Sequence, residues 1–309
     1  MSGLAFLFPG QGSQRVGMGG GLRGADAERL EARLGAAGDA AGLDLRKLCS
    51  TGPMEALTRT EAAQPSLFAV CVTLAEIAAE LGLRPAAVAG HSLGEYTAAV
   101  AGGALGLDDG IALVAQRGRA MARAQQRRPG AMAAVIGLPA EDVAAACADV
   151  RGELSLAPAN LNAPDQVVIS GDVAAVDAFV RRAADAGRPG VRAVRLPVGA
   201  AFHSAMMQPA RDDLAATMTA LAWSDPEVPL VANATGTPVT SAGGVCEALI
   251  EQITAPVRWV DCVRTLVHGG CTTFVELGPG RALAGLARRI APDVQAVSVD
   301  SRAKLEALA

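Results

Sequence analysis

Short apolar runs alternate with longer segments of helical periodicity along most of the chain. Residues 4–8 and 86–90 are such runs, and each is bounded by glycine or proline, as buried strands usually are. Residues 66–81 and 92–101 instead carry apolar side chains at helical spacing. This alternation predicts an α/β fold in which helices cover a mostly parallel sheet. Later segments continue the pattern, with helices expected over 204–221, 245–254, 261–269 and 280–290, and strands over 230–233, 273–276 and 295–299.

The middle of the chain has a different order of elements. After a connector at Arg127–Gly130, the pattern predicts β-α-β-β-α-β, which is the ferredoxin-like arrangement. We expect a small ferredoxin-like domain over 129–198, inserted into a large α/β-hydrolase-like domain made of 1–128 and 199–309. The expected strands are 132–136, 154–160, 166–171 and 191–196, and the expected helices are 140–149 and 173–186.

Composition and charge exclude several classes of protein. The 309 residues carry 27 basic and 31 acidic side chains, a formal net charge of −4, whereas a nucleic-acid-binding protein usually carries a basic excess. We find no unbroken apolar stretch of about 18 residues and no basic segment before an apolar one at the start, so neither a membrane span nor a signal peptide is predicted. The six cysteines are scattered without a Cys-x-x-Cys pair. We therefore expect reduced thiols in a cytoplasm, with no disulfide framework and no metal site.

The most informative segment is Gly90-His91-Ser92-Leu93-Gly94, which fits Gly-x-Ser-x-Gly between a short apolar strand and a helix. In that context the motif predicts a nucleophile elbow, with Ser92 exposed on a sharp turn. The helix that follows directs its free N–H groups and its positive dipole end toward the serine. Leu93, directly after the serine, is the expected donor of one N–H to an oxyanion.

A serine nucleophile needs a base, and the chain has only three histidines. His91 is adjacent to Ser92 and is expected to support the turn. His268 lies at a predicted helix end, where a surface role is the ordinary interpretation. By elimination, His203 is the candidate general base.

A second glycine-rich loop, Gly10-Gln11-Gly12-Ser13, follows the first strand. It lacks the lysine of a P-loop and the third glycine of a dinucleotide-binding motif. Because loops at the carboxyl ends of strands in one sheet face the same crevice, this loop is placed to offer the Gln11 N–H to the same oxyanion.

Taken together, these motifs resemble one family. The sequence from Phe6 to about Ile290 is similar to the malonyl-CoA:acyl carrier protein transacylases, whose acyltransferase unit also occurs in polyketide synthases. The matching segments, in order, are Gly10-Gln11-Gly12-Ser13-Gln14, Gln64-Pro65, Gly90-His91-Ser92-Leu93-Gly94-Glu95, Gln116-Arg117-Gly118-Arg119, Asn160-Leu161-Asn162, Phe202-His203 and Glu276-Leu277-Gly278-Pro279-Gly280.

The resemblance implies a role for each matching position. Ser92 is the implied nucleophile, His203 the acid/base, and the N–H groups of Gln11 and Leu93 the oxyanion hole. Arg117 is implied to hold the malonyl carboxylate, although from the sequence alone a solvated arginine is the ordinary interpretation. The remaining implied roles are a backbone carbonyl at Gln252 that orients the histidine, a pocket residue of the small domain at Asn162, and a malonyl-type signature at Phe202. Ala255 departs from the family pattern, where Asn often stands before the proline.

The resemblance also implies the substrates and the partner. Malonyl-CoA donates the acyl group and the phosphopantetheine thiol of an acyl carrier protein accepts it, without a permanently bound cofactor, in fatty-acid or polyketide synthesis. Because carrier proteins are generally acidic, small-domain arginines are a candidate docking patch, although solvated helix faces explain any single one. The patch consists of Arg181, Arg182, Arg188, Arg192 and Arg195.

Three alternatives remain open at the level of sequence. A polyketide acyltransferase for methylmalonyl or ethylmalonyl units would share these residues. The acyltransferase subunit of malonate decarboxylase would as well, although its elbow usually lacks the glutamate found here at position 95. A serine esterase also fits Gly-x-Ser-x-Gly, but the inserted unit and the missing acidic partner for the histidine disfavour it.

Overall fold

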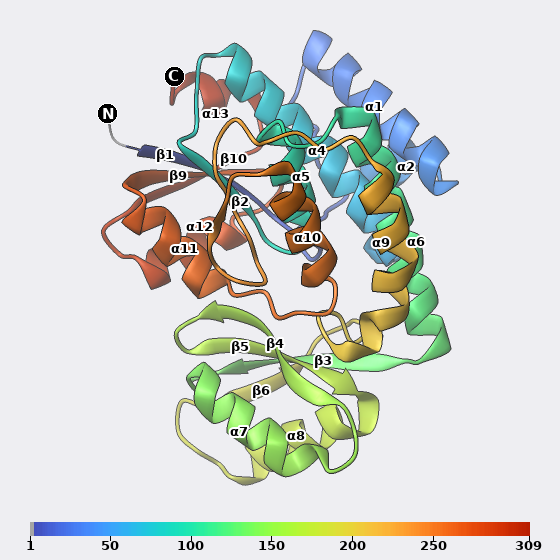
Figure 1. Cartoon of the computed structure of the whole chain (residues 1–309), viewed down its shortest axis with the longest axis vertical. Coiled ribbons are helices and arrows are strands. Elements are labelled where there is room, and N and C mark those ends of the chain that lie inside the picture. Colours follow the sequence, from blue (N-terminus) through green and yellow to red (C-terminus); the bar gives the residue numbers. More distant parts are fainter. Residues whose placement is uncertain (1–2) are drawn as a thin grey trace.

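Two β-sheets organise the chain in the computed structural model, which describes residues 3–309 (Figure 1). The larger sheet has the strand order β10-β9-β1-β2-β7-β8, and its strands are parallel except for the β7–β8 pair at one edge. Its strands are β1 Gly3–Phe8, β2 Ala87–Gly90, β7 Leu230–Val231, β8 Pro238–Val239, β9 Cys271–Leu277 and β10 Gln295–Val299. The predicted α/β class with a mostly parallel sheet is confirmed.

Helices cover both faces of this sheet. Along β1, Phe6 and Phe8 pack into one core, whereas Ala5 and Leu7 pack into a second core on the opposite face. This alternation follows from the two-residue period of a strand. The first core is covered by α1 Ala25–Ala41, α2 Leu45–Thr51, α4 Thr60–Glu80, α5 Leu93–Ala101, α6 Leu107–Arg127, α9 Gln208–Ala220 and α10 Ala242–Gln252, and the second by α11 Trp259–His268 and α12 Ala282–Ile290. Two short helices, α3 Met54–Thr58 and α13 Arg302–Glu306, also belong to this part of the chain. The larger sheet and the helices around it are called the large body below.

The smaller sheet is antiparallel, with the strand order β4-β5-β3-β6. Its elements run β3 Gly130–Ile136, α7 Ala140–Arg151, β4 Leu156–Ala163, β5 Gln166–Asp172, α8 Val173–Asp185 and β6 Arg192–Arg195, which is the predicted order. Both helices lie on the face of the sheet away from the large body (Figure 1). On the other face, Met132 and Val168 join the first core of the large body. The chain enters and leaves at one place, where the Gly130 N–H donates to the Gly199 carbonyl over 3.1 Å.

Several predicted boundaries need correction. Helix α4 begins at Thr60 rather than at residue 66, and it contains Pro65 in its second turn. The expected helix over 204–221 is divided into a 3-10 turn, Ala205–Met207, and α9. The sequence pattern predicts no element over 25–58, where the structure has α1, α2 and α3.

Helix α4 also qualifies the expectation that nothing in the chain is apolar enough to cross a membrane. By length and composition alone, Thr60–Glu80 passes that test. However, 89% of its apolar window is buried inside the protein. The helix packs between α1 and α6, and its apolar side chains are covered by the rest of the protein.

Candidate active site

Ser92 stands at a sharp turn between β2 and α5, at the carboxyl edge of the parallel sheet. Its backbone is held at φ 54° and ψ −108°, a left-handed conformation that non-glycine residues rarely adopt. The flanking glycines make the turn possible. A Cβ on Gly90 would lie 1.9 Å from the carbonyl carbon of Gly94, and one on Gly94 would lie 1.9 Å from the Phe8 oxygen. The elbow predicted from the motif is thus built as expected.

An asparagine that the sequence did not single out holds the elbow. The Ser92 N–H donates to Asn233 Oδ1 over 2.8 Å, and Asn233 Nδ2 donates to the Gly90 carbonyl over 2.7 Å. Asn233 follows β7, the neighbouring strand, and its side chain is fully buried. Its amide therefore satisfies backbone groups on both sides of the serine and fixes the strained turn.

His203 contacts the serine directly. Its Nε2 lies 2.7 Å from Ser92 Oγ, and its Nδ1 lies 2.9 Å from the Gln252 carbonyl oxygen. Because a carbonyl only accepts, Nδ1 carries the proton and the Nε2 lone pair faces the hydroxyl. Burial, followed by the positive charge of Arg117, lowers the pKa of His203 to about 3. The imidazole is therefore neutral and ready to accept a proton at neutral pH.

This lowered pKa has a kinetic consequence. We expect kcat/KM for acylation of Ser92 to change by no more than about twofold between about pH 7 and about pH 5, because the base stays neutral. With an ordinary histidine, whose pKa is about 6.5, the rate would fall about twenty-fivefold over the same range. Stopped-flow release of the thiol, with circular dichroism as a check on folding at each pH, measures this profile. A fall in rate with a midpoint at about pH 6.5 would contradict the assignment of His203 as a base with a lowered pKa.

Two backbone N–H groups, one in the elbow and one in the neighbouring loop, have no acceptor within the described residues. Within residues 3–309, neither the Gln11 N–H nor the Leu93 N–H donates to a protein acceptor. Leu93 begins α5, so its N–H is one of the donors that a helix leaves unpaired at its start. The Gln11 loop is pressed close to the elbow, since a Cβ on Gly10 would lie 2.3 Å from the His91 oxygen. These donors are suited to stabilise an oxyanion.

Arg117 reaches the nucleophile from inside the protein. The side chain is completely buried on α6, and its Nη2 lies 3.2 Å from Ser92 Oγ. Nη1 donates to Gln64 over 2.8 Å, Nη2 donates to Gln252 Oε1 over 2.9 Å, and the guanidinium lies 4.8 Å from the centre of the Tyr96 ring. Within the described residues its Nε has no hydrogen-bond partner. A buried guanidinium that faces a nucleophile without a carboxylate ion partner is prepared to receive an anionic group.

The side chain of Gln252 connects these groups. Its Nε2 donates to the Ser92 carbonyl over 2.8 Å and to Glu95 Oε2 over 2.6 Å. Glu95 is fully buried, and burial raises the pKa of its carboxyl to about 8. The resemblance implies that the backbone carbonyl of Gln252 orients the histidine. It implies no role for the Gln252 amide or for Glu95.

The serine opens into a cavity of about 450 Å³. Phe202, only 9% exposed, lies on its wall beside His203. Residues from both parts of the chain line this cavity. Gln11, Gln64, His91 and Met121 belong to the large body, and Met132, Asn160 and Leu196 lie in the small sheet or next to it. An adjoining hollow of about 600 Å³ shares Gln11, Met54, Thr58, Val198 and Phe202 with this cavity.

Asn162 contacts His91, the residue directly before the nucleophile. Its Oδ1 is 2.8 Å from His91 Nε2, and it lines a hollow of about 550 Å³ that shares Gln11, Gly12 and His91 with the cavity at Ser92. Asn160, two residues earlier on the same strand, lines the serine cavity instead. His91 also packs on Trp259, with ring centroids 5.5 Å apart, so it supports the turn as expected. Asn162 thus joins the small sheet to the elbow.

Over the described residues 3–309, no group of three or more His, Cys, Asp or Glu side chains is arranged to hold a metal ion. All six cysteines are free and buried. The functional groups that the site does offer are a serine, a neutral imidazole, two backbone N–H groups and a guanidinium.

Comparison with known proteins identifies relatives of this chain. Residues 5–299 match the acyl transferase domain family. The chain is 38% identical to the malonyl CoA-acyl carrier protein transacylase of Bacillus subtilis, covering 99% of this chain and 96% of that protein. It is 42% identical to the polyketide biosynthesis protein ThaF of Burkholderia thailandensis over 93% of this chain, which corresponds to 24% of ThaF.

Solved structures agree with the sequence relatives. The malonyl-CoA:acyl carrier protein transacylase of Xanthomonas oryzae superposes with a TM-score of 0.92 at 40% identity, covering 100% of this chain and 98% of that one. A malonyl-transacylase solved in complex with its type II polyketide acyl-carrier protein gives 0.91 at 38% identity, covering 98% of each chain. Family match, full-length relatives and superposition together establish that this chain belongs to the acyl transferase family.

Proposed function

We propose that the protein transfers a malonyl group from malonyl-CoA to the phosphopantetheine thiol of an acyl carrier protein, through an ester on Ser92. One observation carries this proposal: the buried Arg117 guanidinium lies 3.2 Å from the nucleophile and has no carboxylate ion partner among residues 3–309. A desolvated carboxylate is costly to bury unless a group of this kind pairs with it. Malonyl thioesters carry a free carboxylate, whereas the neutral esters of a simple esterase do not.

In the first half-reaction, His203 Nε2 takes the proton from Ser92 Oγ as the oxygen attacks the thioester carbonyl. The N–H groups of Gln11 and Leu93 hold the negative oxygen, a contribution of about 3 kcal/mol per donor in comparable sites. The tetrahedral intermediate collapses, the C–S bond breaks, and the imidazolium returns its proton to the CoA sulfur. A malonyl ester remains on Ser92, with its carboxylate held by Arg117.

In the second half-reaction, the carrier thiol loses its proton to His203 and attacks the ester. The same two N–H groups hold the oxyanion, and the imidazolium then protonates Oγ as the C–O bond breaks. Because CoA leaves the malonyl ester on Ser92 before the carrier thiol attacks it, the reaction is ping-pong. The small cavity favours a thiol delivered on a long arm over bulk water.

Small-sheet residues are proposed to form a separate inserted domain. The order β4-β5-β3-β6 with two helices on one face supports a ferredoxin-like domain over 129–198. The remaining residues, 1–128 and 199–309, would then be an α/β-hydrolase-like domain that carries the nucleophile elbow. The serine cavity lies between the two, since Met132 and Asn160 line it from one side and Met121 from the other.

Acyl selectivity is proposed to depend on Phe202 as well as on Arg117. Phe202 lines both the serine cavity and the adjoining hollow. A substituent on the central malonyl carbon would meet its ring beside His203. One methyl group changes such a preference by only about 1–3 kcal/mol, so we propose a preference for malonyl over methylmalonyl rather than an absolute selection.

For the carrier protein, we propose docking on the arginines of the small domain. All five are exposed, and within the described residues three of them form no salt bridge: Arg181, Arg188 and Arg192. Arg182 and Arg195 instead pair with Asp149 and Asp177. The six free, buried cysteines suit the reducing cytoplasm in which we propose that the protein works.

Reversing the charge of Arg181, Arg188 and Arg192 to glutamate should slow transfer to the carrier about tenfold at low salt. Acylation by malonyl-CoA should stay within about twofold, because the patch does not line the serine cavity. Arg264, exposed on α11, gives a matched control when it is changed to glutamate. Carrier transfer that is unaffected by the triple change would place docking elsewhere.

The proposed function is tested by mixing the protein with malonyl-CoA and a phosphopantetheinylated carrier and following the carrier by mass spectrometry. We expect one malonyl group on the carrier, at rates well above those with acetyl-, methylmalonyl- or succinyl-CoA. Transfer of methylmalonyl as fast as malonyl would support the extender alternative, and hydrolysis without transfer would support the esterase.

A further inference from the structure

Both hydrogens and the oxygen of the Gln252 side-chain amide form hydrogen bonds behind the active site. Its nitrogen donates both hydrogens, to the Ser92 carbonyl and to Glu95, and its oxygen accepts from Arg117 Nη2. Because a carbonyl accepts and a guanidinium only donates, these partners define which end of the amide faces which group. The side chain is fully buried on α10, so no solvent competes for these bonds.

Glu95 has no contact with the cavity, yet it is buried in the same network. It lies three residues after Ser92 on α5, it is fully buried, and it does not line the serine cavity. Its Oε2 accepts from Gln252 over 2.6 Å, whereas its Oε1 has no partner within the described residues. Burying a carboxyl that is only half satisfied is costly, so a site with this arrangement invites a functional explanation.

We propose that Glu95 is a positioning residue: by accepting from Gln252 Nε2, it turns the amide oxygen toward Arg117 and so holds the guanidinium for the acyl carboxylate. This inference rests on the proposed malonyl transfer and names a further residue that determines its selectivity. His203 is held by the backbone carbonyl of Gln252, which does not depend on the side-chain amide. Glu95 therefore acts on selectivity and not on the base.

Loss of the acceptor would release the amide. Without Glu95 Oε2, one Nε2 hydrogen is unpaired, and rotation of the amide by half a turn becomes less unfavourable. In that rotated state, Nε2 would face the Arg117 Nη2 donor, and the two would repel. The guanidinium would then lose one of the two glutamine oxygens that hold it, since the other is on Gln64.

The test compares single-turnover acylation of Ser92 by malonyl-CoA and by acetyl-CoA, which lacks the carboxylate. In Glu95→Leu, we expect the malonyl-to-acetyl rate ratio to fall about tenfold, while the acetyl rate stays within about twofold. Glu95→Gln retains an oxygen that accepts from Gln252 and should recover most of the ratio. Circular dichroism and thermal melting establish that each variant is folded.

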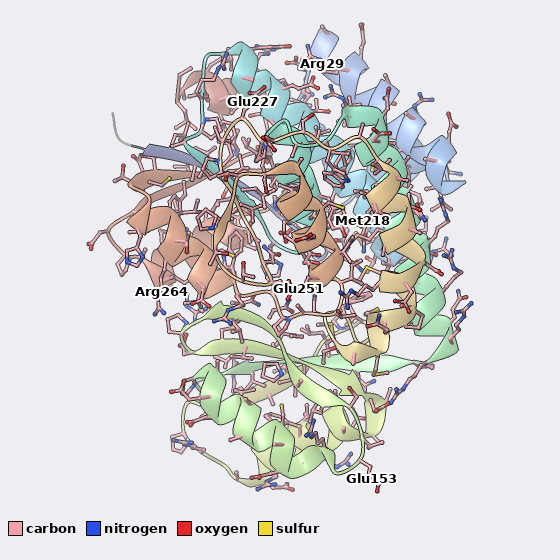
Figure 2. The ribbon with its side chains drawn as sticks, in the orientation of Figure 1. Arg29, Glu153, Met218, Glu227, Glu251 and Arg264 are labelled. Carbon is pink, nitrogen blue, oxygen red and sulfur yellow. The ribbon has the colours of Figure 1, made fainter. Side chains whose placement is uncertain are left out.

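A second variant tests the route through the amide. Gln252→Ala removes the amide but keeps the backbone carbonyl that holds His203, so it should lower the ratio about tenfold as well. The double variant should be no worse than either single variant, because both act on one connection. Glu251→Leu is the matched control, since this neighbouring glutamate is exposed on α10, where Figure 2 labels it. Its ratio should match that of the unaltered protein.

The outcomes separate this inference from the proposed function. If the unaltered protein is not malonylated, the proposed function fails. If it is malonylated but Glu95→Leu slows both acyl groups equally, Glu95 has a merely structural role and the inference is overturned. An unchanged ratio in Glu95→Leu or in Gln252→Ala overturns it as well, and if Glu95→Leu does not fold, Gln252→Ala decides alone.

Discussion

Changing His203 to alanine should slow malonylation of Ser92 about a thousandfold, which is within the range that a positioned general base contributes. The imidazole Nε2 lies 2.7 Å from Oγ, and within residues 3–309 the other group that contacts Oγ is Arg117, which only donates. With the imidazole removed, no protein group at the serine remains to take its proton. Single-turnover mass spectrometry of the acylated protein measures the rate.

Two further variants separate the lost base from other effects. His203 has a φ of 56°, which asparagine tolerates better than most residues, so His203→Asn removes the base with less backbone strain. It should be as slow as the alanine variant. His268→Ala, at the exposed end of α11, should keep the full rate. If the alanine and asparagine variants stay within about tenfold of the unaltered protein, another group is the base.

The second large effect is expected at Arg117. Arg117→Ala should slow malonylation about a hundredfold, because the acyl carboxylate would enter a dry site without its charged partner. Acetylation should change far less, so the protein should lose its preference for acyl groups that carry a carboxylate. Competition between malonyl- and acetyl-CoA, read by intact mass, gives the preference directly.

The controls use neighbours on the same helix. Arg117→Lys keeps a charge but not two parallel N–H donors, so its malonylation should lie between the alanine variant and the unaltered protein. Arg123→Ala removes an exposed arginine of α6 that pairs with Asp213 over 2.9 Å, and it should keep the preference. An Arg117→Ala protein that still prefers malonyl-CoA would remove the observation on which the proposed function rests.

Much of the fold was predictable because its strands are short apolar runs with clear ends. The positions of Gly90 and Gly94 predict the elbow. Residues 129–198 have strands and helices in the predicted order. Residues 25–58 were missed because their helices have a weak apolar pattern. Helix α1 buries Asp26, Arg33 and Gly38 beside its leucines, so its core-facing side does not stand out in the sequence.

The predicted start of α4 is wrong, and the reason is a different one. Proline usually marks a helix start, so the sequence places the boundary at Pro65, directly before the predicted helix over 66–81. In the structure α4 begins five residues earlier, at Thr60, and tertiary packing keeps the segment helical, with Ala62, Ala63 and Gln64 buried. At this position, burial in the core outweighs the preference of proline for the start of a helix.

The serine, the histidine and the two loops were accessible from motifs, but the network behind them was not. Gln252 lies 160 positions after Ser92, and its amide meets Glu95 and Arg117 only because α10, α5 and α6 pack together. Asn233 had no signal in the sequence beyond its place after a predicted strand. Hydrogen bonds between side chains of distant elements depend on packing geometry, which a single sequence does not encode locally.

The central claim is that malonyl-CoA acylates Ser92. The most direct test is the intact mass of the protein after brief mixing with malonyl-CoA, measured alongside Ser92→Ala and followed by peptide mapping. We predict one malonyl adduct on the unaltered protein, located on Ser92, and none on Ser92→Ala. An adduct that persists in Ser92→Ala, or an unaltered protein that takes up no malonyl group, would contradict this account.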